Sequence, residues 1–357
     1  MHFDLMTGSL TWQESADLAR DVEAAGFSGM LFTETSQVPW MMIAAAATAA
    51  PRLDFSTGIA VAFPRSPMIA AQIAWELARN TDGRFRLGLG SQVRAHVTRR
   101  YASDFDRPAV RMRDYVQAVK ASLAAFRGDA RLDHSGPFYS LNLLRPEWIP
   151  PRHEHGDIKV DISAVGPLMC KVAGEVADGL HVHPMHSMHY IENRLRPALA
   201  EGAAKANRDP GAIDLIVPTF AIPGDTPEER APLVARTRTQ LAFYGSTPNY
   251  AFQFDDLGFP GTTDRIRARL RAGDAAGAAA AITDEMFDHF AVVARWDDLA
   301  DVLIRRYEGV ANRLVTYLAR DSIRRDAAML DRWGEVARAI VTISERRARP
   351  PTRRSSA

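Results

Sequence analysis

The chain has one cysteine, Cys170, among its 357 residues, and it has no long hydrophobic run. A single cysteine cannot form an internal disulfide, so the sequence excludes a disulfide-stapled fold and favours a reducing, cytoplasmic compartment. The most apolar stretch, residues 41–50, is alanine-rich and far shorter than the roughly 20 residues of a membrane-spanning helix. The first residues also lack the basic segment and apolar stretch of a signal peptide. We therefore expect no membrane-embedded segment.

Net charge is also nearly absent. Lys and Arg number 44 and Asp and Glu number 43, which leaves a formal charge of +1. Without an excess of positive charge there is no general attraction for nucleic acid or anionic membranes, so neither is expected as a partner. Hydrophobic residues make up 46% and charged residues 24%, which excludes disorder of the whole chain. Only residues 346–357, rich in Arg, Pro and Ser, are expected to form a disordered basic tail.

The sequence does contain a regular alternation of short apolar runs and segments with helical spacing of apolar residues. The expected strands are residues 3–7, 28–33, 53–62, 84–90, 158–163, 179–183, 213–222 and 313–318. The expected helices include residues 12–25, 39–50, 67–80, 107–126, 167–177, 226–243 and 321–346. Eight β-then-α repeats predict an α/β fold of the (β/α)8 TIM-barrel type, whereas an open doubly wound sheet would have fewer strands. We expect one domain over residues 1–345, with residues 245–262 as an insertion loop.

Two turns after expected strands have features suited to an anionic ligand. Gly88 and Gly90 lack a Cβ, so a flat ring or another backbone can approach closely, and Ser91 offers a hydroxyl and an N–H group. Val165, Gly166 and Pro167 precede an expected helix, whose N-terminal N–H groups favour an anion. Each turn alone is typical of many βα loops. Two such turns at the ends of neighbouring strands favour the binding of one phosphate-bearing ligand between them.

Histidines gather near the sixth expected strand. His181 and His183 share one strand face, and His186 and His189 follow. Neutral imidazoles bind zinc, so a metal-dependent hydrolase is an alternative hypothesis. No cysteine or carboxylate stands at ligand spacing beside them, however, so we expect no metal. Lining of an active site by one histidine and ordinary structural roles are the other interpretations.

Three segments together resemble the bacterial luciferase-like monooxygenase superfamily: residues 56–67, residues 82–91 and residues 166–179. The resemblance is closest to the branch that uses the deazaflavin coenzyme F420, and a sister branch uses reduced FMN. It implies a luciferase-like barrel, a cofactor at the carboxyl end of the strands and a homodimer. The small residues of the alanine-rich helix are also consistent with close packing against a second copy.

The resemblance also implies roles for individual residues. Gly58–Ile59 matches a non-prolyl cis peptide that lies against the cofactor ring in the superfamily. Glu34 matches an acid in the loop after the second strand, although Glu34-Thr35 stands here where Asp-His is common. Gln92 likewise replaces a usual glycine. The residues expected to contact the cofactor are Trp40, Gly58, Ile59, Gly90, Ser91, Val165, Gly166 and Pro167.

The function expected from these observations is a coenzyme F420-dependent oxidoreductase that transfers a hydride between the deazaflavin and a small organic substrate. Glu34 is the expected acid/base, with His181 as the second choice. The alternative is a reduced-FMN-dependent monooxygenase; a metal-dependent hydrolase and a non-catalytic cofactor-binding protein are further readings. The substrate pocket is expected to be formed by residues 92–106 and 245–262, and the sequence does not identify the substrate.

Overall fold

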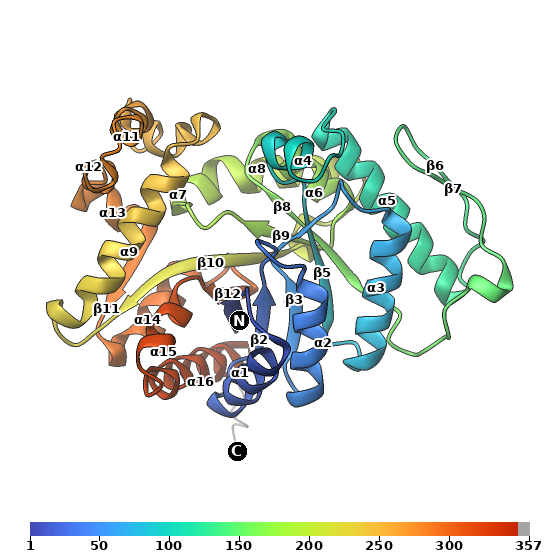
Figure 1. Cartoon of the computed structure of the whole chain (residues 1–357), viewed down its shortest axis with the longest axis horizontal. Helices are drawn as coiled ribbons and strands as arrows, with labels where there is room; N and C mark the ends of the chain where they lie inside the picture. Colours follow the sequence, from blue (N-terminus) through green and yellow to red (C-terminus); the bar gives the residue numbers. More distant parts are fainter. Residues whose placement is uncertain (349–357) are drawn as a thin grey trace, which may run out of the picture.

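In the computed structural model, which describes residues 1–348, eight parallel strand positions close into a barrel surrounded by helices (Figure 1). Around the barrel these are β1 (His2–Thr7), β2 (Gly29–Phe32), β3 (Asp54–Thr57) continued by β4 (Ala60–Val61), β5 (Phe85–Gly90), β8 (Lys159–Ala164), β9 (Gly179–Val182), β10 (Asp214–Pro223) and β12 (Arg313–Thr316). Parallel pairing of β12 with β1 and of β9 with β10 completes the circle. The predicted (β/α)8 TIM barrel is confirmed.

The helices that cover the barrel begin and end where the sequence provides caps. Thr11 and Glu14 form a capping box at the start of α1, and Gly26, with φ of 94°, ends that helix. Proline stands in the first turn of several others. The long helices are α1 (Trp12–Ala25), α2 (Pro39–Ala49), α3 (Pro67–Asn80), α5 (Pro108–Arg127), α6 (Pro167–Val176), α8 (Arg196–Lys205), α9 (Pro227–Gly245), α11 (Thr262–Arg271), α14 (Trp296–Tyr307) and α16 (Met329–Ala348).

Shorter elements fill the connections. They are α4 (Arg94–Arg99), α7 (Met188–Tyr190), α10 (Phe252–Asp255), α12 (Ala275–Ala280), α13 (Asp284–Phe290), α15 (Ala319–Arg325), the hairpin of β6 (His134–Ser135) and β7 (Ser140–Leu141), the 3-10 helices η1 (Pro146–Trp148), η3 (Pro210–Ala212) and η4 (Pro248–Tyr250), and the π-helix η2 (Ile191–Leu195). Helices α11–α13 lie beside α9 at one end of the molecule, and the β6–β7 hairpin projects at the other (Figure 1). Among residues 1–348, no helix is both long and apolar enough to span a membrane.

Four details differ from the sequence-based expectations. The third strand is not continuous over residues 53–62, because the chain bends between β3 and β4. Residues 245–262 are not an irregular loop: they contain η4, α10 and the first residue of α11. A strand that the sequence did not indicate, β11 (Ala291–Ala294), pairs in parallel with the outer end of β10. The closing helical segment is divided into α15 and α16, and α16 continues to Ala348, whereas residues 349–357 of the expected tail lie outside the described part.

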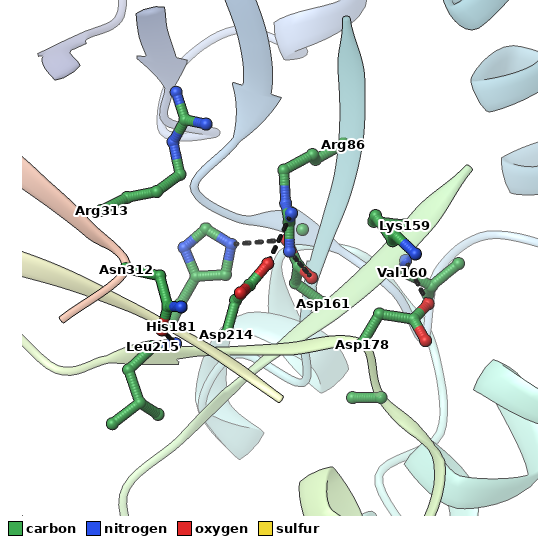
Figure 2. Close-up of polar contacts among 12 residues, drawn as sticks. Arg86, Lys159, Val160, Asp161, Asp178, His181, Asp214, Leu215, Asn312 and Arg313 are labelled. Atoms are coloured by element: carbon green, nitrogen blue, oxygen red, sulfur yellow. Dashed lines mark hydrogen bonds and ion pairs between the residues drawn. The ribbon is translucent and has the colours of Figure 1, made fainter. Parts of the chain in front are cut away.

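The amino-terminal half of the barrel interior contains two arginines, each held by two aspartates. Arg313 on β12 bonds both carboxylate oxygens of Asp4 (2.6 and 2.8 Å) and reaches Asp54 at 2.8 Å. Arg86 on β5 makes the corresponding contacts with Asp161 on β8 and Asp214 on β10 (Figure 2). Apolar side chains lie beside these pairs and join the strands across the barrel: Met6, Leu31, Ile216 and Val315. The base of the barrel is therefore fixed by ion pairs and its middle by packing.

Candidate functional site at the carboxyl end of the barrel

A bend after β3 shapes one side of the barrel mouth. The Gly58–Ile59 peptide bond is cis, which confirms the geometry implied by the resemblance. A Cβ on Gly58 would lie 1.8 Å from Leu31 Cδ2, so the glycine is required by packing inside the barrel. The Ile59 side chain instead lies over Gly90, where a Cβ would meet Ile59 Cδ1 at 2.5 Å and Ser163 Oγ at 2.8 Å. Gly90 therefore provides the space that the Ile59 side chain occupies.

Arg65 contacts both Glu34 and Trp40 next to this bend. Glu34 is 7% exposed, and its Oε2 accepts hydrogen bonds from Val61 N (2.8 Å) and Arg65 Nη1 (2.7 Å), while Oε1 accepts from Arg65 Nη2. The Arg65 guanidinium also lies 5.7 Å from the centroid of the Trp40 ring. In the three hydrogen bonds, Glu34 is the acceptor. The geometry favours a positioning role for Glu34, which anchors β4, over the proton transfer expected from the sequence.

The two anion-friendly turns lie side by side, because β5 and β8 are neighbouring strands. Ser91 follows β5, and its hydroxyl donates to the Gln92 carbonyl at 3.2 Å. Gly166 is the N-cap of α6, and a Cβ there would meet nothing within 4 Å. The backbone before it is held by Tyr190, whose hydroxyl donates to the Val165 carbonyl at 2.7 Å. Because the first N–H groups of a helix have no partner within it, this turn offers donors next to open space.

His181 lies deeper than the sequence suggested. It is 4% exposed on β9, and its ring points toward Asp161, with Nε2 3.7 Å from Oδ2 (Figure 2). A Cβ on Gly88 would approach the same nitrogen to 2.7 Å, so Gly88 makes room for the imidazole. Burial raises the pKa of Asp161, but the neighbouring His181 ring and the charge and hydrogen bonds of Arg86 outweigh it and lower that pKa to about 2. His181 therefore belongs to the buried ion-pair layer beneath the mouth.

His183, which directly follows β9, lies at the carboxyl end of the barrel. Its Nδ1 accepts a hydrogen bond from Met185 N at 3.1 Å, and its ring lies 4.6 Å from that of Tyr244 and 4.8 Å from that of Tyr250. The hydroxyls of Tyr244 and Tyr317 are hydrogen-bonded to each other. We call His183, Tyr244, Tyr250 and Tyr317 the aromatic wall; all four are half-buried. The alternation of His181 and His183 was visible in the sequence, but strand depth, which separates their surroundings, was not.

His186 lies in the turn after β9 and makes two hydrogen bonds there. Its Nδ1 donates to the His183 carbonyl at 2.9 Å, and its Nε2 accepts from the Tyr307 hydroxyl at 3.1 Å. The side chain is buried, and burial lowers the pKa of His186 to about 4. Within residues 1–348, no group of three or more His, Cys, Asp or Glu side chains is arranged to hold a metal ion. These contacts give His186 a structural role in holding the turn after β9.

We expect His186 to make stability pH-dependent. Its folded pKa of about 4 lies below the ordinary 6.5, so between these values the unfolded chain binds a proton that the native chain does not. Stability is therefore lost as the pH falls from 6.5 toward 4, by up to about 3 kcal/mol for this group. Urea unfolding at pH 7.5 and pH 4.5 should show a smaller loss in His186→Gln than in the parent chain. An equal loss in the two proteins would contradict this assignment.

Comparisons with known proteins agree with this geometry. Residues 2–313 match the family model described as luciferase-like monooxygenase. An uncharacterised protein of Mycobacterium tuberculosis is 36% identical over 301 residues, which cover 84% of this chain and 88% of that protein. An F420-dependent glucose-6-phosphate dehydrogenase of Nocardia farcinica is 29% identical over 193 residues, or 54% of this chain and 55% of the relative.

Solved structures show the same fold at low sequence identity. The F420-dependent tetrahydromethanopterin reductase of Methanopyrus kandleri superimposes with a TM-score of 0.73 at 19% identity, covering 93% of this chain and 97% of that one. The oxygenating constituent of 3,6-diketocamphane monooxygenase from Pseudomonas putida, solved with FMN, gives 0.61 at 15% identity, covering 94% and 98%. The family model matches residues 2–313, which is most of the chain, and the barrel with its cis bend agrees with that match. This chain therefore belongs to the luciferase-like monooxygenase family.

Proposed function

We propose that this protein is an F420-dependent oxidoreductase that transfers a hydride between the deazaflavin and a small organic substrate. The proposal rests on two neighbouring surfaces at the carboxyl end of the barrel. An apolar surface at Ile59, built over Gly90, lies one strand away from the open helix N-terminus at Gly166. This pairing suits a flat ring joined to a phosphate-bearing tail. The choice of F420 over FMN is supported by relatives whose names include F420.

The residues present fit such a group. Ile59 offers an apolar face for one side of a ring, and the turn at Gly166, beside the turn at Ser91, offers backbone N–H donors for a phosphate. Gly166 leaves space that a side chain would fill. When bound, F420 supplies a hydride donor or acceptor, so the protein contributes orientation and electrostatics.

The chain's own residues have distinct roles in this proposal. Glu34 holds Val61 N and Arg65 and thereby fixes β4 and the Ile59 surface. Arg65, in turn, lies over the ring of Trp40, which is buried in the core. His181 supports the floor through Asp161. We therefore assign Glu34 to positioning, whereas the buried Nε2 of His181, 3.7 Å from Asp161 Oδ2, has no hydrogen-bond partner within residues 1–348.

Cofactor titration tests the proposal. Purified protein should quench the fluorescence of F420 with a Kd in the micromolar range, about −8 kcal/mol. FMN, titrated in the same way, should bind at least tenfold more weakly. Tight binding of FMN with no binding of F420 would overturn the proposal and favour the reduced-FMN monooxygenase, the alternative that the structural similarity to an FMN-bound monooxygenase keeps open. A metal-dependent hydrolase would instead retain stoichiometric zinc after dialysis against a chelator.

We also propose that the protein is a homodimer in which the outer face of α2 contacts a second copy. Met41 is 54% exposed, and Ala44 and Thr48 are exposed on the same side of the helix. The opposite face, with Met42, Ile43 and Ala46, is buried in the core. Light scattering at micromolar concentration should give twice the 39.4 kDa chain mass, and the monomer mass would contradict the dimer.

A further inference from the structure

The aromatic wall closes the side of the barrel mouth opposite the bend at Ile59. Its members come from four separate segments: His183 follows β9, Tyr244 lies in the last turn of α9, Tyr250 belongs to η4, and Tyr317 follows β12. The rings meet edge-on or tilted, with the planes of His183 and Tyr244 at 76° and those of Tyr244 and Tyr317 at 66°. Tyr317 also packs on Phe220, at 5.1 Å between centroids. Neighbours behind the wall therefore fix the orientation of its rings.

The wall presents hydrogen-bond donors without charge. Because Nδ1 of His183 accepts from Met185 N, the single hydrogen of the neutral ring is on Nε2. Burial lowers the pKa of His183 to about 4, so the ring is neutral near pH 7. Of the paired Tyr244 and Tyr317 hydroxyls, one donates to the other. Within residues 1–348, the hydrogen bond and ring contacts of the His183 side chain involve only Met185, Tyr244 and Tyr250.

We propose that the aromatic wall recognises an uncharged, planar aldehyde or ketone, aromatic or conjugated, or the matching alcohol, and that His183 Nε2–H donates a hydrogen bond to its oxygen. Half-buried aromatic rings favour contact with flat apolar groups. The lack of a charged partner at His183 disfavours carboxylates and phosphates as the recognised group. A neutral imidazole donates a hydrogen bond without releasing its proton, so His183 orients and polarises the oxygen. The assignment of a redox substrate depends on the proposed function, whereas binding to the wall does not.

A chromophoric aldehyde provides a test that needs no turnover. The absorption band of 4-(dimethylamino)cinnamaldehyde moves to longer wavelength when its carbonyl oxygen accepts a hydrogen bond. Titrated into the protein without F420, the probe should bind saturably and keep its band at or beyond the wavelength seen in buffer. In His183→Phe the bound band should move to shorter wavelength, as in an apolar solvent, with affinity changed by less than about tenfold. His183→Asn, which retains a donor, should restore the longer wavelength.

Further variants separate the wall from the rest of the surface. Tyr250→Leu should weaken probe binding by about tenfold, because it removes a ring that contacts His183. His189→Phe, at an exposed position outside the wall, should leave both affinity and band position unchanged. Absence of saturable binding, or the same band position in His183→Phe as in the parent chain, would overturn the proposal. Probe binding in a protein that fails to bind F420 would refute the proposed function and leave the wall's role standing.

Discussion

Asp161→Asn is expected to destabilise the barrel by about 3 kcal/mol or more, because it removes one charge from a buried ion pair. Arg86 bonds both oxygens of Asp161, at 2.8 and 2.9 Å, and the Asp161 side chain is fully buried. The second partner, Asp214, bonds Arg86 at 2.8 Å but is one-third exposed, so it compensates only in part. Urea unfolding at pH 7 measures the loss.

A paired variant identifies charge as the cause. Arg86→Gln combined with Asp161→Asn keeps polar groups at both positions but leaves neither charge, so it should be more stable than Asp161→Asn alone. A double variant that is no more stable than the single one would show that packing around His181 and Gly88 dominates. The lowered pKa of Asp161, about 2, adds a second signature. The contribution of the ionised Asp161 to the free energy of unfolding should be present above pH 3.8 and be lost as the pH falls toward 2. This loss should occur in the parent chain and not in the two variants that lack Asp161.

Gly90→Ala should weaken F420 binding by at least about tenfold, or about 1.4 kcal/mol, while the barrel stays folded. The added Cβ would meet the end of the Ile59 side chain at 2.5 Å, so that side chain must move, into the space assigned to the cofactor ring. Fluorescence titration gives the affinity, and thermal unfolding monitors the fold. Unchanged F420 affinity in a folded Gly90→Ala protein would contradict the placement of the ring over Ile59.

Gly88→Ala is the matched comparison, two residues earlier on the same strand. Its Cβ would lie 2.0 Å from the Thr57 carbonyl oxygen, which belongs to the backbone of β3 and cannot rotate away. This variant should therefore lose stability, whereas Gly90→Ala should chiefly lose cofactor affinity. Adding Ile59→Ala to Gly90→Ala removes the overlapping atoms and should restore part of the affinity. The three proteins together separate a disturbed strand from a disturbed cofactor surface.

Periodicity and turn chemistry in the sequence were sufficient to predict the barrel. Eight apolar runs separated by helical spacing, prolines at helix starts and Gly26 at a helix end are local signals, and each follows from backbone geometry. The resemblance carried by residues 56–67 also predicted the cis bond at Gly58–Ile59. Strand β11 was missed because it is a short run that pairs with the outer end of β10, outside the closed barrel. Local pattern does not reveal such a pairing.

The roles of the polar residues were decided only by the tertiary structure. Arg86 meets Asp161 and Asp214 across 75 and 128 residues of sequence, so no local spacing announces the pairs. Glu34 was expected to transfer protons, but closure of the barrel brings Arg65 and Val61 N onto its carboxylate. Strand depth likewise distinguishes His181 from His183. A strand's alternation tells which side chains point inward, whereas their chemical surroundings depend on which distant strands become neighbours.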